Sequence, residues 1–131
     1  MLDIQPGAVG KAEMVVGTND TAPCIGTGRI AVLATPVMIN LMEEAALAAV
    51  EHLLPTGKQS LGTRIDVTHI AATPTGMKVI ATAKVLEVGG RQIKLAISAR
   101  DEVDLIGEGQ HDRVVVTADS FQARISEKAK R

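Results

Sequence analysis

Alternating apolar and polar residues in the second half of the chain predict strands. In the segment from Met77 to Val88, every second residue from Met77 to Val85 is apolar, and in the segment from Gln92 to Asp101 the same alternation runs from Ile93 to Ala99. A period of two turns one face of each strand toward the core. The pair Gly89-Gly90 between the two segments favours a tight hairpin turn. These residues therefore predict an antiparallel hairpin with one buried face.

Two further segments have strand character. Residues 60–72 are rich in isoleucine, valine and threonine, and residues 105–118 carry alternating valines near their end. Branched side chains of this kind favour the pleated backbone. A bulge is expected near Gly107 or Gly109, because glycine inside a strand often marks one. With a strand from about residue 10 to 18, we expect five or six strands in all.

A nearly continuous apolar segment from Ala34 to Leu54 predicts one long helix before these strands. Thr35 suits the N-cap and Pro36 the first helical position, while Pro55 follows the end of the segment. A helix of this composition needs other residues to cover most of its surface. The residues before it, from Asn19 to Ala34, form a loop rich in glycine and proline. We expect this loop to be a surface connection or a wall of a pocket.

One carboxylate is out of place on the predicted helix. At about 100° per residue, the polar residues that share a single solvated line are Asn40, Glu44 and Glu51. Glu43 projects elsewhere, into a sector with Ile39, Leu47, Val50 and Leu54. An ionisable group among aliphatic side chains must be paired, neutral or functional. Glu43 is therefore the first candidate for chemistry.

These elements predict a single α+β domain over residues 1–131, in which a mostly antiparallel sheet wraps around one long central helix. This arrangement is known as a hotdog fold. Consecutive hairpins favour antiparallel pairing. An open sheet of this kind leaves edges unpaired and one face partly uncovered, so we expect a homodimer at least. The polar tail SEKAKR is expected to be frayed.

The composition limits the classes of partner. The chain has 14 basic and 15 acidic residues without a long run of either sign, so the charge pattern of a nucleic-acid binder is missing. Phe121 is the only aromatic residue, which argues against a stacking platform for bases. Glutamates interrupt the most apolar segment, which argues against a membrane span. The first residues do not resemble a secretory signal, and we expect a cytoplasmic protein.

Few residues offer chemistry. Cys24 is the only cysteine and lies in a loop without a nearby base, so a catalytic role is disfavoured. The histidines at 52, 69 and 111 are too far apart in sequence to form a metal motif, and no metal or cofactor is expected. The types that make sense together are Glu43 as nucleophile or general base, His69 as proton shuttle and Thr35 as a hydroxyl that orients them. A purely structural role for Thr35 as a helix cap remains open.

Three segments, TPVMINLMEEAA, SLGTRIDVTHIAATPTGMKV and EVDLIGEGQHDRVVV, resemble the fluoroacetyl-CoA thioesterase family of hotdog enzymes. The likeness covers about residues 34–124. It implies a homodimeric hydrolase of short-chain acyl-CoA thioesters, with catalytic roles for Thr35, Glu43 and His69. It also implies that the Gly62 backbone N–H faces the thioester carbonyl and that Arg113 lies near the coenzyme A entrance or the subunit interface. Coenzyme A would enter only as part of the substrate.

One departure from the family bears on selectivity. Its fluoroacetyl-specific members carry phenylalanines in the lid region before the helix, whereas this chain has none there. We therefore expect a preference for another short acyl-CoA. Three alternatives stay open: an acyl-CoA-binding hotdog protein without activity, a hotdog dehydratase or hydratase, and a purely structural dimer.

Overall fold

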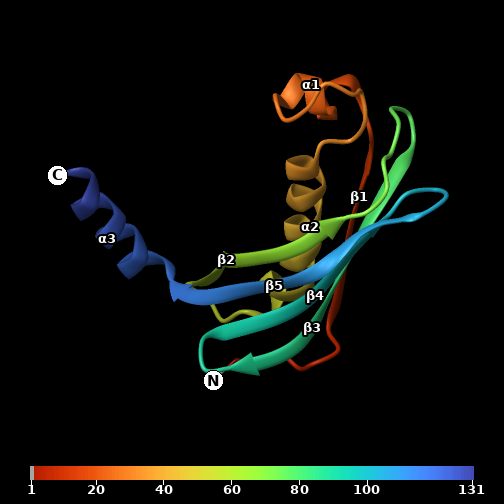
Figure 1. The fold of residues 1–131 in the computed structure, drawn as a ribbon. Coiled ribbons are helices and arrows are strands. Elements are labelled where there is room, and N and C mark those ends of the chain that lie inside the picture. The colour runs from red at the N-terminus through yellow and green to blue at the C-terminus, as the bar shows by residue number, and fades with distance from the viewer. Residues whose placement is uncertain (1) are drawn as a thin grey trace.

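The computed structural model describes residues 2–131, which form one curved antiparallel sheet around a helix (Figure 1). The strand order is β1-β3-β4-β5-β2. In chain order the elements are β1 (Val9–Val15), the 3₁₀ turn η1 (Thr18–Asp20), α1 (Ala22–Ile25), α2 (Thr35–Val50), the 3₁₀ turn η2 (Glu51–Leu53), β2 (Lys58–His69), β3 (Lys78–Gly89), β4 (Gln92–Arg100), β5 (Leu105–Thr117) and α3 (Ala118–Ala129).

The sheet confirms the alternation of the sequence. The buried residues of β3 and β4 are Val79, Ala81, Ala83, Val85, Ile93, Leu95, Ile97 and Ala99. The expected bulge is confirmed beside Gly107: Ala99 pairs with Gly107 and Arg100 with Leu105, so that Ile106 is the extra residue. Every strand pair is antiparallel, and the strands number five within residues 2–131. β1 and β2 lie at the two edges.

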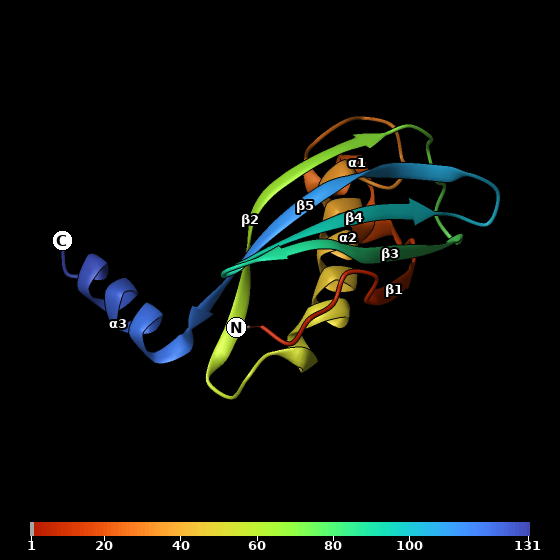
Figure 2. The same cartoon turned by 90° about the horizontal axis from the view of Figure 1, so that it is seen from below.

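Helix α2 fills the concave side of the sheet, as Figure 2 shows from below. Its buried residues are Met38, Leu41, Met42, Ala45, Ala46, Ala49 and Val50. The small alanines let β1 pass close to the helix. A Cβ placed on Gly10 of β1 would overlap the backbone of Ala45 and Ala49. The contact of β1 with α2 therefore requires glycine at this position.

Replacing Gly10 by alanine is expected to destabilise the fold by about 3 kcal/mol or more, because the added methyl must push a helix backbone away. Gly89→Ala is the matched control, since a Cβ there meets nothing within 4 Å and Gly89 lies outside the positive-φ glycines. Urea unfolding of both variants measures the difference. Equal midpoints for the two variants would contradict the close approach.

The start of α2 differs from the prediction. Ala34 is the N-cap, and Thr35 and Pro36 are the first two helical residues. The Thr35 hydroxyl is directed to His69 and not to the backbone of the first turn. Leu33 N–H donates to the Thr73 carbonyl at 2.8 Å, which fixes the chain just before the helix. Thr35 is therefore not a cap, and its hydroxyl contacts a distant part of the chain.

The exposed face of α2 is wider than the single polar line that the sequence predicts. Leu47 is 39% exposed and Ala48 is exposed beside Glu44. The Glu43 side chain is 41% exposed, so its sector is not a buried apolar one. The helix also ends at Val50, four residues earlier than expected, and continues as η2. One side of α2 is thus uncovered within residues 2–131.

The C-terminal segment is the largest correction, because residues 126–129 of the tail that was expected to be frayed form the end of helix α3 (Figure 1). Ala118 N–H donates to the Gly57 carbonyl at 2.9 Å, so α3 begins beside the start of β2. The helix then projects away from the sheet. Within residues 2–131, none of the helices combines the length and apolarity that crossing a bilayer requires.

Candidate active site

Thr35 and His69 meet at the N-terminal end of α2. The segment that follows β2 pairs with the segment that precedes α2, through a bridge between Val32 and Pro74. This pairing places His69, the last residue of β2, beside the first turn of the helix. Thr35 Oγ1 lies 2.7 Å from His69 Nδ1, a hydrogen-bond distance. Two residues 34 positions apart in sequence thus form one polar pair.

The other ring nitrogen of His69 is buried, and it has no hydrogen-bond partner among residues 2–131. Burial lowers the pKa of His69 below 6.5, and the Ala71 backbone opposes this shift to a smaller extent. Desolvation disfavours the charged imidazolium, so the ring is neutral at neutral pH. A neutral ring with one nitrogen on a hydroxyl and the other unpaired is suited to proton transfer.

A cleft of about 750 Å³ opens beside this pair. Its walls come from α1, the segment before α2, the first turns of α2 and the residues after β2. They include Ala22, Val32, Leu33, Ile39 and Ile70, with Thr35 and His69. The loop that precedes α2 is thus a wall of this cleft. Its lining contains no phenylalanine, tyrosine or tryptophan and is mostly aliphatic, which suits a small apolar group such as a short acyl chain.

Glu43 belongs to a second polar cluster, two turns further along α2. Its Oε2 atom lies 3.5 Å from Arg113 NH1, and Arg113 is only 5% exposed. A Cβ placed on Gly62 would come within 2.5 Å of the same oxygen, so the Glu43 carboxylate lies directly against the Gly62 backbone and would have to move if a side chain were added there. β2 and β5 hold these residues together, since Gly62 and Arg113 face each other in register.

Arg113 is held by partners inside the chain. Its Nε donates to Ser60 Oγ at 2.8 Å and its NH2 to the Ser60 carbonyl at 3.0 Å. Ser60 Oγ donates in turn to Glu51 at 2.7 Å. Burial lowers the pKa of Arg113 from its ordinary value, while Glu43 and Glu51 counteract the shift. The guanidinium is therefore a fixed, buried cation that faces the Glu43 carboxylate.

His111 completes the cluster, and its hydrogen bonds show which of its ring nitrogens carries the proton. Nδ1 lies 2.8 Å from the Arg64 carbonyl, which can only accept, so Nδ1 carries a proton. Nε2 lies 3.1 Å from Arg113 NH1, which can only donate, so Nε2 is the acceptor. The 3.8 Å approach of Nε2 to Glu43 is then no ion pair. His111 orients the guanidinium and does not share charge with the carboxylate.

The backbone N–H of Gly62 points to the open edge of β2. Ser60 N–H donates outward to Glu51, and Val115, opposite Ser60, donates to the Arg91 carbonyl on its other side. Ser60 and Val115 are therefore a non-hydrogen-bonded pair. Two residues further on, Gly62 has the same orientation, because the strand period is two. Its N–H is available to a ligand or a second chain.

The two clusters stay separate within one chain. Thr35 and Glu43 are about 12 Å apart along the helix axis. No hydrogen bond joins Glu43 to Thr35 or His69 in the part of the chain that the structure describes. The predicted site residues thus form two half-sites, Thr35 with His69 and Glu43 with Gly62 and Arg113. The sequence analysis missed Glu51, Ser60 and His111 as members of the site. Only His111 had a signal in the sequence, its HxR spacing with Arg113.

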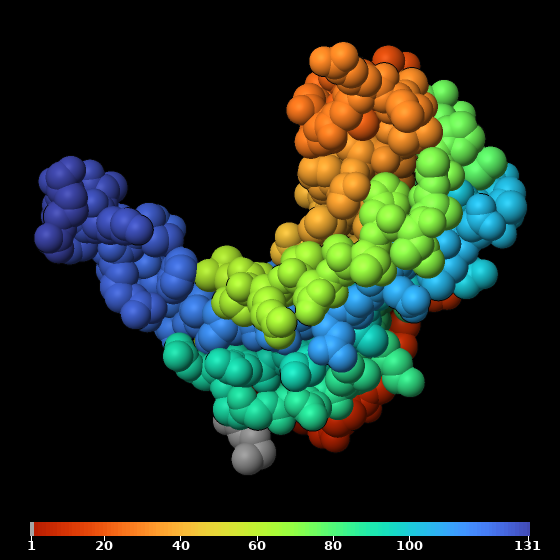
Figure 3. All heavy atoms as spheres, in the orientation of Figure 1, coloured from red at the N-terminus to blue at the C-terminus, as the bar shows by residue number. Residues whose placement is uncertain are grey.

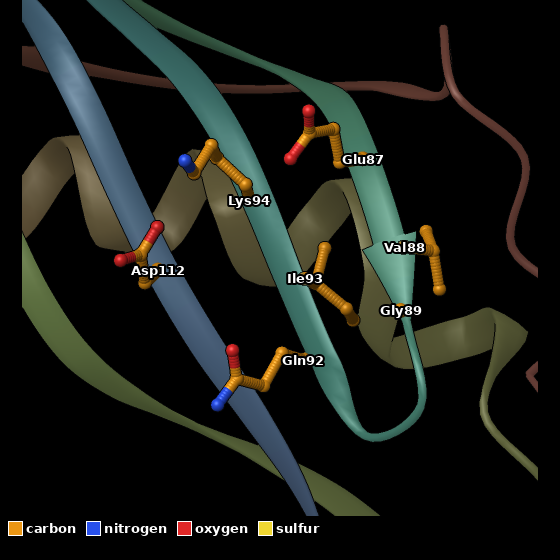
Figure 4. Close-up of a pocket in the computed structure, with 7 residues that line it drawn as sticks. All are labelled: Glu87, Val88, Gly89, Gln92, Ile93, Lys94 and Asp112. Carbon is orange, nitrogen blue, oxygen red and sulfur yellow. The ribbon is translucent and has the colours of Figure 1, made fainter.

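A second hollow, of about 470 Å³, lies on the sheet near the turn between β3 and β4 (Figure 4). Glu87, Lys94 and Asp112 face it from three neighbouring strands, since Glu87 pairs with Lys94 and Lys94 with Asp112. A register shift between Val85 and Glu87 of β3 lies beside it. It contains none of the predicted site residues. Within residues 2–131, no group of three or more His, Cys, Asp or Glu side chains could hold a metal ion.

Comparison with known proteins identifies relatives of this architecture. Residues 16–119 match the family model described as fluoroacetyl-CoA-specific thioesterase. The fluoroacetyl-CoA thioesterase of Streptantibioticus cattleyicolor is 45% identical over 97 residues, which cover 74% of this chain and 70% of the relative. A structure of the fluoroacetyl-CoA thioesterase FlK has a TM-score of 0.89 at 37% identity, and the match covers 95% of this chain and 97% of that one.

A thioesterase superfamily member from Thermus thermophilus, described as a hypothetical protein, has a TM-score of 0.92 at 26% identity. That match covers 100% of this chain and 97% of the other. FlK has also been solved as a threonine-to-serine mutant in complex with acetyl-CoA.

Proposed function

The chain belongs to the fluoroacetyl-CoA-specific thioesterase family, and from this premise we propose that it hydrolyses short-chain acyl-CoA thioesters to the free acid and coenzyme A. It is a hotdog-fold thioester hydrolase by this membership. The observation that carries the proposal for its own residues is the 2.7 Å contact of Thr35 with His69 at the mouth of an aliphatic cleft. The reaction needs no cofactor besides the coenzyme A of the substrate.

A homodimer would join the two half-sites. β2 is an edge strand, and the Gly62 N–H points away from its neighbour β5. The exposed face of α2 carries Leu47 and Ala48, which a second copy would cover. If two β2 strands pair antiparallel, Gly62 and Glu43 of one copy approach Thr35 and His69 of the other. Each active site then contains residues of both copies.

The proposed reaction begins with attack on the thioester carbonyl by Glu43 or by a water that Glu43 deprotonates. The C–O bond forms while the carbonyl electrons move onto oxygen, where the Gly62 N–H donates a hydrogen bond to the oxyanion. Collapse breaks the C–S bond, and the neutral His69 ring relays to the thiolate the proton that the reacting water has released, so that the ring ends the reaction neutral. Thr35 holds the His69 ring in position. In the route through Glu43 as nucleophile, water then hydrolyses the acyl-glutamyl anhydride.

Arg113 is assigned a different role from the one that the resemblance implies. Its donors are directed to Ser60, His111 and Glu43, and its guanidinium is buried. A guanidinium in this position pairs with the Glu43 carboxylate and limits its rotamers. We therefore place Arg113 in support of Glu43 and not on the coenzyme A phosphates.

A panel of acyl-CoA substrates with thiol release as readout tests the proposal. We expect turnover of acetyl-, propionyl- and butyryl-CoA. Because no phenylalanine, tyrosine or tryptophan lines the cleft, we expect kcat/KM for fluoroacetyl-CoA to stay within about tenfold of that for acetyl-CoA, or ~1.4 kcal/mol. A kcat/KM for fluoroacetyl-CoA several hundredfold above that for acetyl-CoA would contradict the expected lack of fluoroacetyl selectivity. Binding of all four without thiol release would favour the non-catalytic alternative.

A further inference from the structure

Helix α3 has an apolar stripe that lacks a partner within residues 2–131. The stripe consists of Ala118, Phe121, Ile125 and Ala129, which fall within about 80° around the helix axis. No residue of α3 is buried, and Ile125 is 45% exposed. An isolated helix of 12 residues is marginal in water, because most helical stability comes from packing of an apolar face. α3 therefore needs a surface on which to pack.

Backbone and side-chain contacts fix the place where α3 begins. Ala118 N–H donates to the Gly57 carbonyl at 2.9 Å, and Lys58 Nζ donates to Thr117 Oγ1 at 2.6 Å. The helix thus starts at the first residue of the edge strand β2. In Figure 3, α3 stands on one side of a hollow and the α1–α2 side of the molecule on the other, with β2 along its floor. A second copy that pairs along β2 would occupy this hollow.

The proposed active site determines which part of the second copy meets α3. Gly62 of one copy must lie near His69 of the other, on antiparallel β2 strands. Lys58 precedes Gly62 by about 13 Å of strand. The start of α3 therefore lies about 13 Å beyond His69 of the other copy, alongside its residues 70–73.

The surface at that position is apolar and exposed. Ile70 is 55% exposed and lines the cleft, and the next two residues, Ala71 and Ala72, line it as well. α3 is about 18 Å long, enough to cross the mouth of the cleft. Arg124 and Lys128 flank Phe121 on the same side of the helix. They would bring positive charge to the place where a coenzyme A phosphate enters.

We infer that α3 packs its apolar stripe, through Phe121 and Ile125, on the mouth of the acyl-CoA cleft of a second copy of this chain, so that each cleft is completed in trans. The inference rests on the proposed function and its dimer. The partner subunit thus covers the exposed stripe. In this position α3 is a wall of the substrate site and supplies cationic side chains for the substrate phosphates.

Crosslinking tests this contact without using activity. In a Cys24→Ser background, chains with Ile125→Cys are co-expressed with chains with Ile70→Cys and treated with a short bis-maleimide. We expect a covalent dimer in amounts well above those of either variant alone. The matched control replaces Ile125→Cys by Glu127→Cys, about 160° away around the helix. Equal crosslinking of the two positions, or no crosslink from Ile125→Cys, would overturn the inference.

Kinetics separate this inference from the proposed function. The double variant Phe121→Ser/Ile125→Ser should raise KM for acetyl-CoA about tenfold and leave kcat within about twofold, because Thr35, Glu43 and His69 are unchanged. A wild-type KM would contradict the role of α3 in the cleft. If the unmodified protein releases no thiol from any acyl-CoA, the proposed function fails, whereas the crosslink still decides whether α3 contacts the second copy.

Discussion

Glu43→Gln is expected to lower kcat for acetyl-CoA by about 10²–10⁴-fold, because the amide can neither attack the thioester nor deprotonate water. The fold should survive, since Gln keeps an oxygen acceptor for Arg113 and the side chain is 41% exposed. Thiol release under saturating substrate measures the loss. Circular dichroism and gel filtration check that the variant remains folded and assembled.

The neighbouring residue supplies a matched control for this experiment. Glu44 is exposed, and its side-chain hydrogen bond within residues 2–131 is with Asn40 at 3.2 Å. Glu44→Gln removes the same charge one position away and should leave kcat within about twofold. Comparable losses in both variants would mean that helix charge matters and not the carboxylate of Glu43.

The same carboxylate leaves two chemical routes, which isotope labelling separates. A single turnover in ¹⁸O-labelled water places the label in the product acid if water attacks directly. If Glu43 attacks and water then cleaves the anhydride at the glutamyl carbonyl, the label enters the enzyme. Mass analysis of the peptide that contains Glu43 distinguishes the two outcomes.

His69→Ala should have a comparable effect, a loss of about 10²–10⁴-fold in kcat, because the leaving thiolate loses its proton donor and Thr35 loses its partner. His52→Ala is the control, since His52 is exposed on η2 and does not line the cleft. Near-normal turnover of His69→Ala would exclude the ring from the reaction.

The pH dependence gives His69 a signature of its own. Burial lowers its pKa from 6.5, so the neutral ring that contacts the Thr35 hydroxyl persists into mildly acidic solution. Activity should fall only as pH drops through this lowered pKa, and a profile of kcat from about pH 5 to 8 should show its acidic limb below 6.5. The limb should vanish in the residual activity of His69→Ala.

Local sequence patterns predicted the sheet well because they are physical requirements of single elements. The alternation in β3 and β4 reflects a buried face, and the glycines of β5 mark a bulge and a close approach. Gly107 lies against Met38, and a Cβ on Gly109 would overlap the Asp66 carbonyl. Periodicity also identified α2 and the anomalous position of Glu43. These properties depend on neighbours that are close in sequence.

The partners of Glu43 could not be predicted in this way. Arg113 is 70 residues distant along the chain, and only the register of β2 against β5 brings it to α2. Likewise, Thr35 looked like a helix cap until the pairing of Val32 with Pro74 placed His69 beside it. Periodicity placed Glu43 among aliphatic residues because it cannot tell a covered helix face from an open one.

The sequence by itself determined the strands, the central helix and the residue types of the site, because hydrophobic periodicity and retained motifs are local properties of the chain. The tertiary structure decided which of these residues meet: it joined Thr35 to His69, enclosed Arg113 against Glu43, and left one face of α2 and the stripe of α3 uncovered. These outcomes depend on long-range register and on which surfaces another element can reach, and neither is encoded in the spacing of residues along one segment.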